Sequence, residues 1–147
     1  MAQAQRSIVV EVTTEQLYDV IADFGKYAEF LPEVKKTEVK AEGAAQIVTY
    51  TIDIKATKIS YTLKHTSTKP TRLEWHLLKG DMMKANDGTW TLKSVSADQT
   101  EATYDIDLKL GALVPGFIEK ALAEQGLPDL LSNFKKRAEK LHPKGAA

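Results

Sequence analysis

Residues 13–34 read TTEQLYDVIADFGKYAEFLPEV and predict two short helices near the start of the chain. Thr13 is a suitable N-cap, and Gln16 three residues later completes a capping box. The apolar residues of the first helix recur at helical spacing on one face: Leu17, Val20, Ile21 and Phe24. A further helical turn over residues 26–31 ends where Pro32 disfavours helical backbone in the residue before it. These helices come before most of the predicted strands. This order suggests that the sheet is curved and encloses a space.

Most of the remaining chain alternates between apolar and polar residues, which is the period of a half-buried β-strand. The strand patterns cover residues 7–12, 34–41, 45–54, 58–66, 72–78, 90–94 and 100–110. Residues 79–88 break the alternation and contain Asn86-Asp87-Gly88, so we interpret them as a loop or a wide hairpin connection. Alternation over this many segments predicts an antiparallel sheet of six or seven strands with one covered face.

The C-terminal part of the chain carries apolar residues at helical spacing from Pro115 to Leu141. Gly126 and Pro128 interrupt this stripe, so the helix should kink or break near Gly126. The order of strand, helix pair, strands and long helix is typical of an α+β helix-grip fold, a curved antiparallel β-sheet around a long C-terminal α-helix. We expect a single domain over residues 1–147, with its core at about 7–141 and a flexible tail at 142–147.

Composition narrows the classes of function. The chain has 147 residues, enough for one domain with a substantial core, and 43% of them are hydrophobic. Lysine plus arginine and aspartate plus glutamate both number 20, so no overall charge draws the chain to DNA or to an anionic membrane. The absence of cysteine excludes thiolate catalysis, and no apolar segment approaches the roughly 20 residues of a membrane-spanning helix. We therefore expect a cytoplasmic protein without membrane insertion.

Two runs of residues resemble a known family. Leu17-Tyr-Asp-Val-Ile-Ala-Asp-Phe24, followed by Tyr27-Ala-Glu-Phe-Leu-Pro32, resembles the polyketide cyclase/dehydrase and lipid-transport family of the START-like (SRPBCC) superfamily. Trp75-His-Leu-Leu-Lys-Gly80 with Asp87-Gly-Thr-Trp90 looks like paired strands of the same family. The resemblance covers about residues 7–141 and is nearest to the branch of coenzyme Q-binding proteins and ribosome-associated toxins. It implies a groove between sheet and last helix that holds a hydrophobic molecule.

We predict that the chain binds or transports a hydrophobic small molecule, a lipid or a polyprenyl quinone-like compound, without catalysing a reaction. The cavity would lie between the sheet and the C-terminal helix. Its predicted walls are inward strand positions and the apolar stripe of the last helix: Tyr50, Tyr61, Leu63, Trp75, Leu77, Trp90, Tyr104, Ile106, Phe117, Ile118, Leu122 and Phe134. His65 shares their strand face and is the candidate for a polar contact. Ordinary core packing is the alternative role of these aromatic residues.

Two other functions stay open. A polyketide cyclase or dehydratase, which the resemblance also implies, needs an inward acid or base, and His65 with a tyrosine is the visible candidate. Lys135-Lys136-Arg137 forms a basic run on the last helix, which is either a solvated face or a contact to the ribosome.

The sequence predicts no metal site and no cofactor. His65, His76 and His142 match no metal-ligand spacing. Asp105 and Asp107 fall on the polar face of their strand, where we expect them to face water rather than act as an acid–base pair. The sequence also contains no nucleophile elbow motif and no glycine-rich phosphate loop after a strand.

Overall fold

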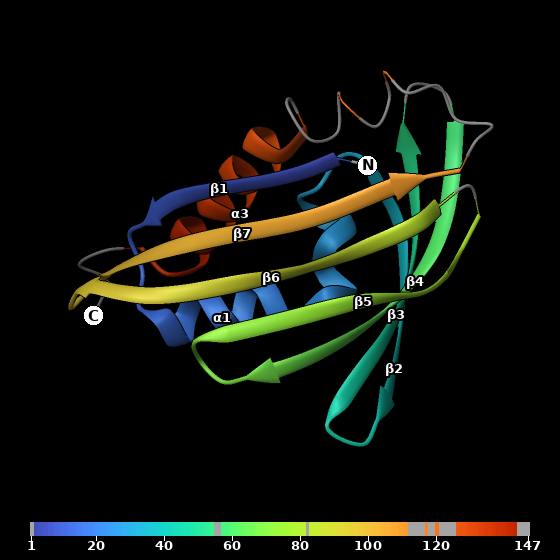
Figure 1. Cartoon of the computed structure of the whole chain (residues 1–147). Helices are drawn as coiled ribbons and strands as arrows, with labels where there is room; N and C mark the ends of the chain where they lie inside the picture. The colour runs from blue at the N-terminus through green and yellow to red at the C-terminus, as the bar shows by residue number, and fades with distance from the viewer. Residues whose placement is uncertain are drawn as a thin grey trace.

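The computed structural model describes residues 2–54, 57–81, 83–111, 117, 120 and 126–143. Within these ranges, seven strands form one antiparallel sheet in the order β1-β7-β6-β5-β4-β3-β2 (Figure 1). The strands are β1 (Ala2–Val10), β2 (Val34–Glu42), β3 (Ala45–Ile54), β4 (Thr57–Thr68), β5 (Arg72–Gly80), β6 (Met83–Ser96) and β7 (Gln99–Leu110). The helices are α1 (Thr14–Ala22), the 3-10 helix η1 (Phe24–Glu29) and α3 (Leu127–Leu141).

The sheet bends around the helices. In Figure 1, β2, β3 and β4 run steeply across the direction of β1, β7 and β6, and α1 and α3 lie together behind the sheet. α3 packs against β1 and α1, while η1 packs against β2. A curved antiparallel sheet with a C-terminal helix on one side is the helix-grip fold that the order of elements predicts, so this prediction is confirmed.

Local sequence explains the helix pair. The Thr13 hydroxyl accepts a hydrogen bond from the Gln16 backbone N–H (3.1 Å), and the Gln16 side chain accepts one from the Thr13 N–H (3.0 Å). This is the predicted capping box. The Tyr27 hydroxyl donates a hydrogen bond to the Ile21 carbonyl, which ties η1 to α1. The residues that the two helices bury are Leu17, Val20, Ile21, Phe24 and Tyr27.

Strand register brings aromatic residues of neighbouring strands together on the concave face. Tyr50 of β3 pairs with Tyr61 of β4, and their rings stack with centroids 5.2 Å apart. Trp90 of β6 pairs with Tyr104 of β7, with ring centroids 4.8 Å apart. Both pairs combine large apolar area with a polar tip, so the concave face is aromatic and sparsely polar.

The prediction of a loop or a wide hairpin connection over residues 79–88 is wrong for most of that range, although β5 and β6 pair with each other only from Trp75 and Gly88 outward. β5 runs to Gly80, and β6 begins at Met83 and pairs with β7 from there onward. Asparagine and glycine favour turns, but contacts with the Trp75 indole explain why Asn86 and Gly88 lie in a strand here. Asn86 Oδ1 accepts a hydrogen bond from Trp75 Nε1 (2.9 Å), and a Cβ on Gly88 would lie 2.3 Å from the Trp75 ring. Tertiary packing therefore overrides local turn propensity here.

α3 begins at Leu127, and the backbone of Gly126 before it is itself helical (φ −66°, ψ −36°), so the kink or break expected near Gly126 stays a prediction. Pro128 lies in the first turn, where a missing N–H costs no helical hydrogen bond. The helical pattern predicted for residues 115–125 falls almost entirely outside the described residues, as does the tail from residue 144. Among the helices that the structure describes, none is long and apolar enough to cross a membrane.

Candidate functional site

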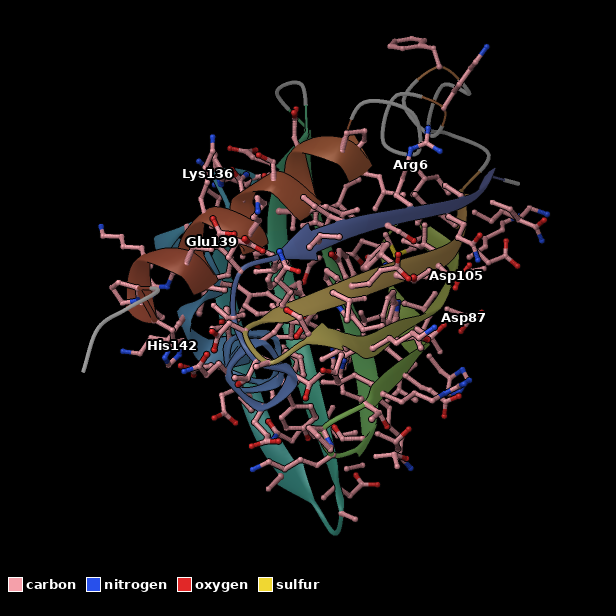
Figure 2. All side chains as sticks on the ribbon, turned by 90° about the vertical axis from the view of Figure 1, so that its left-hand side faces the viewer. Arg6, Asp87, Asp105, Lys136, Glu139 and His142 are labelled. Atoms are coloured by element: carbon pink, nitrogen blue, oxygen red, sulfur yellow. The ribbon has the colours of Figure 1, made fainter. Side chains whose placement is uncertain are left out.

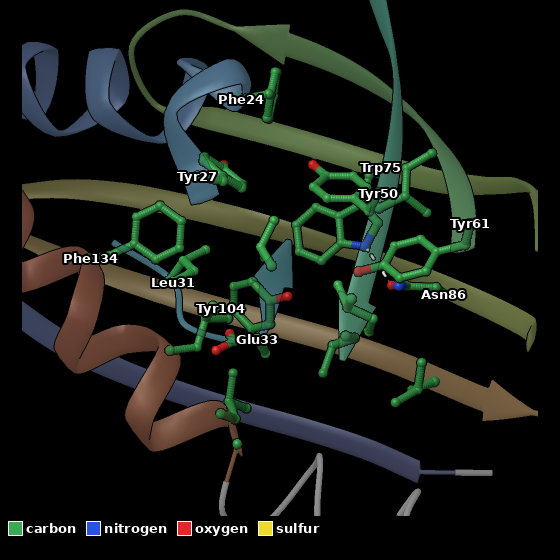
Figure 3. Close-up of a pocket in the computed structure, with 18 of the residues that line it drawn as sticks. Phe24, Tyr27, Leu31, Glu33, Tyr50, Tyr61, Trp75, Asn86, Tyr104 and Phe134 are labelled. Carbon is green, nitrogen blue, oxygen red and sulfur yellow. Dashed lines mark hydrogen bonds between the residues drawn. The ribbon is translucent and has the colours of Figure 1, made fainter. Parts of the chain in front are cut away.

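A cavity of about 390 Å³ lies on the concave side of the sheet, bordered by the α1–η1 pair and by α3 (Figure 3). Apolar and aromatic side chains form most of its wall, with a few polar groups between them. The volume and the lining are typical of a site for a small organic molecule. Nine of the predicted cavity residues line it, eight wall residues and the polar candidate His65: Tyr50, Tyr61, Leu63, His65, Trp75, Trp90, Tyr104, Ile106 and Phe134.

Four predicted residues do not line the described cavity. Leu77 is half-buried and packs against the core beside it. Phe117 is 63% exposed and lies outside the lining, so its assignment to the wall is corrected. The assignment placed Phe117 on the inward side of an apolar helical stripe, whereas its exposure shows that the side chain faces solvent. Ile118 and Leu122 lie outside the described residues.

Sequence patterns do not identify several of the lining residues. Phe24, Tyr27 and Leu31 are predicted as apolar positions of the helix pair, but the structure also places them in the cavity wall. Glu33 follows Pro32, between periodic segments, so no pattern indicates which way it points. The lining also includes acidic and amide residues that sequence patterns did not identify: Glu33, Asp53, Asn86 and Asp129.

Tyr50 and His65 form a hydrogen-bonded pair in the wall. The Tyr50 hydroxyl lies 2.9 Å from His65 Nε2, and the Phe24 ring lies over the imidazole with centroids 4.1 Å apart. Burial lowers the pKa of His65 to about 3. The imidazole is therefore neutral at neutral pH, because a buried cation would lose its hydration.

A second polar contact joins β5 to β6. Trp75 Nε1 donates to Asn86 Oδ1 (2.9 Å), and Asn86 Nδ2 lies 3.7 Å from the Met83 sulfur. Figure 3 shows the Trp75–Asn86 bond at one end of the cavity. Buried polar groups that bond to one another stabilise the wall and leave an apolar surface toward a ligand.

Three further polar side chains line the cavity: those of Tyr61, Tyr104 and Glu33. None of them has a hydrogen-bond partner among the described residues. Burial raises the pKa of the Tyr61 hydroxyl, and the negative charge of Glu33 raises it further. Burial, then Tyr61 and Glu33, raise the pKa of Tyr104. Both hydroxyls are protonated at neutral pH, and Glu33 acts on both of them electrostatically.

The basic run on α3 is largely engaged within the chain. Lys135 Nζ donates to the Val9 carbonyl (2.9 Å) and pairs with Glu139 (2.6 Å). Arg137 pairs with Glu29 at 2.9 Å. Lys136 is exposed on the outer side of α3 (Figure 2).

Asp87 of β6 and Asp105 of β7 lie on the outer face of the sheet (Figure 2). Asp105 accepts a hydrogen bond from Gln5 Nε2 (2.7 Å), and Asp87 lies 3.4 Å from His76 Nδ1. In the described part of the chain, no three His, Asp or Glu side chains gather as a possible metal site.

Comparison with known proteins shows the family of the chain. A model of the family described as polyketide cyclase/dehydrase and lipid transport matches residues 10–135. No curated protein matches the sequence. A START superfamily protein from Mycobacterium smegmatis is similar at a TM-score of 0.84 and 19% identity, over 95% of this chain and 98% of that one.

Two further solved structures are similar in fold. The Zhui aromatase/cyclase from Streptomyces sp. R1128 superimposes at a TM-score of 0.80 and 17% identity, over 99% of both chains. A protein from Thermus thermophilus is similar at a TM-score of 0.84 and 17% identity, over 96% of this chain and 99% of that one. The family model spans most of the sequence, from the end of β1 to the middle of α3, and the chain belongs to the polyketide cyclase/dehydrase and lipid-transport family.

Proposed function

We propose that this protein binds a small hydrophobic molecule in the cavity and releases it chemically unchanged. The observation that carries the proposal is a cavity of about 390 Å³ with an apolar and aromatic wall. Moving a methylene group from water into such a site contributes roughly 0.8 kcal/mol, so a ligand needs few polar contacts to bind. The membership of a family described by lipid transport supports the same function.

The cavity volume limits the ligand. The volume of about 390 Å³ falls in the range of sites for small organic molecules. A fused ring system or a short aliphatic chain fits this space. Of a polyprenyl quinone, the head group and the first part of the tail fit, and a long tail would extend past the described walls.

Catalysis as a cyclase or dehydratase is the second candidate, because the Zhui aromatase/cyclase has a similar fold. Such an enzyme needs a group in the cavity that exchanges protons near neutral pH. With its pKa lowered to about 3 and its Nε2 beside the Tyr50 hydroxyl, His65 is poorly suited to donate a proton. This supports binding over catalysis.

A ribosome-contacting role has less support than ligand binding. Nucleic acid is bound mainly through free lysine and arginine side chains that neutralise phosphates. Two members of the basic run, Lys135 and Arg137, pair with carboxylates of this chain. A ribosome contact through this run would first have to break those pairs.

Mass spectrometry tests the proposed function. The gently purified full chain is measured under native conditions, and its organic extract is analysed beside it. We expect one hydrophobic molecule per chain, carried through purification or taken up from a panel of hydrophobic compounds. A mass of the protein alone in both cases would contradict the proposal.

A further inference from the structure

The charged groups that line the cavity are all of one sign. The charged residues among the described lining are Glu33, Asp53 and Asp129, and this lining includes no lysine or arginine. His65 adds no positive charge, because burial keeps its imidazole neutral. The ionised side chains of the described lining residues are therefore acidic, and a low-dielectric wall strengthens the effect of such a charge on a bound ligand.

These carboxylates come from three separate elements. Glu33 lies between η1 and β2, and its carbonyl accepts a hydrogen bond from the Asp53 N–H of β3 (2.8 Å), which places the two residues side by side. Glu33 and Asp53 are half-buried, whereas Asp129 is exposed in the first turn of α3. Because Asp129 sits where the helix dipole favours an anion, it offsets the positive end of α3 near the cavity.

Glu33 is the carboxylate with the best access to a ligand. Its side chain has no hydrogen-bond or ion-pair partner among the described residues. Figure 3 shows its carboxylate among the lining side chains, in the region of Tyr104. The deeper polar groups are already bonded to each other: Tyr27 to Ile21, Tyr50 to His65, and Trp75 to Asn86.

We propose that the cavity selects a hydrophobic molecule whose polar end donates hydrogen bonds, above all a protonated amine, and that Glu33 receives this end. The proposal rests on the proposed binding function and adds the chemical class of the ligand. A carboxylate accepts charge-assisted hydrogen bonds but donates none, so it matches an ammonium or hydroxyl group. The Tyr61 and Tyr104 hydroxyls, which also line the cavity, supply further acceptors. Carboxylic acids and phosphates are repelled by the same carboxylates.

Three naphthalene probes of nearly equal size test this selectivity: 2-naphthylmethylamine, 2-naphthalenemethanol and 2-naphthoic acid. Binding to the full chain is measured by isothermal titration calorimetry at pH 7 and low salt. We expect the amine to bind at least about tenfold more tightly than the acid, with the alcohol between them. Glu33→Gln should reduce the ratio of amine to acid to within about threefold.

Glu38→Gln is the matched control, because it removes the same charge from an exposed residue of β2 outside the cavity, paired with Lys36. The ratio should stay at its wild-type value in this variant. Asp53→Asn provides a second cavity variant, expected to lower the ratio in the same direction, if Glu33→Gln does not fold.

The outcomes separate this inference from the proposed function. Equal or tighter binding of the acid, or an unchanged ratio in the folded cavity variants, overturns the inference while leaving hydrophobic binding in place. Failure of all three probes to bind overturns the proposed function and the inference with it.

Discussion

The Tyr50 hydroxyl lies 2.9 Å from Nε2 of His65, and both side chains are buried in the cavity wall. Each group satisfies the other, so β3 and β4 carry a polar contact inside an apolar surface. Phe24 covers the imidazole from the helix side. The pair therefore stabilises the wall in the absence of any ligand.

Removing the Tyr50 hydroxyl should destabilise the protein. Tyr50→Phe leaves Nε2 of His65 buried without its partner, which costs about 1–3 kcal/mol of unfolding free energy. Tyr61→Phe is the control, since the Tyr61 ring stacks on Tyr50 but its hydroxyl has no hydrogen bond among the described residues. Urea denaturation of both variants measures the difference. Equal losses would show that the hydrogen bond contributes nothing.

His65 should make the stability depend on pH. Its folded-state pKa is lowered to about 3 from the ordinary 6.5, so between these values the unfolded chain binds more protons than the folded one. The stability due to neutral His65 is complete above pH 6.5 and is lost as the pH falls toward 3, by at most about 1.4 kcal/mol per pH unit.

The variant His65→Phe isolates this contribution. Its unfolding free energy should fall less steeply than that of the wild type as the pH is lowered from neutral toward the folded-state pKa, as measured by urea denaturation at each pH. Parallel curves for the two proteins would mean that His65 titrates equally in both states.

Gly88 should tolerate no side chain. A Cβ there would lie 2.3 Å from both the Asp105 carbonyl oxygen and the Trp75 ring, so Gly88→Ala should cost about 1–3 kcal/mol or more. At Gly25, a Cβ meets nothing within 4 Å, and Gly25→Ala is the matched control. Thermal unfolding compares the two variants. A Gly88→Ala protein as stable as Gly25→Ala would contradict the close packing of β6 on Trp75.

The capping box should stabilise α1. Thr13→Ala removes the acceptor for the Gln16 N–H and should cost about 1 kcal/mol. Thr13→Ser keeps the hydroxyl and should restore most of the stability. If the alanine and serine variants unfold at the same denaturant concentration, the cap has no energetic role.

Sequence patterns predicted the fold because short stretches of neighbouring residues determine each of its helices and strands. The capping box at Thr13, the apolar face of α1 and the period-two strands each need only neighbouring residues to be recognised. Strand parity also placed Tyr50, Tyr61 and Tyr104 on one face. None of these features depends on contacts between distant segments.

The parts that sequence patterns missed depend on tertiary contacts. Asn86 and Gly88 have the chemistry of a turn, and only the Trp75 indole explains their place in a strand. Glu33 follows a proline, and its position at the cavity follows from the pairing of its carbonyl with Asp53. The apolar spacing of the last helix predicted an inward Phe117, but spacing alone does not show which residues the sheet covers, and this side chain faces solvent.

The most direct test of binding in the cavity uses N-phenyl-1-naphthylamine, an uncharged probe that fluoresces in apolar surroundings. Leu130→Trp fills the cavity from α3, and Leu141→Trp makes the same change at a 50% exposed position of that helix. We predict one probe per chain for the wild type and Leu141→Trp, and binding at least about tenfold weaker for Leu130→Trp. Equal binding by all three folded proteins, or none by the wild type, would contradict a ligand site in this cavity.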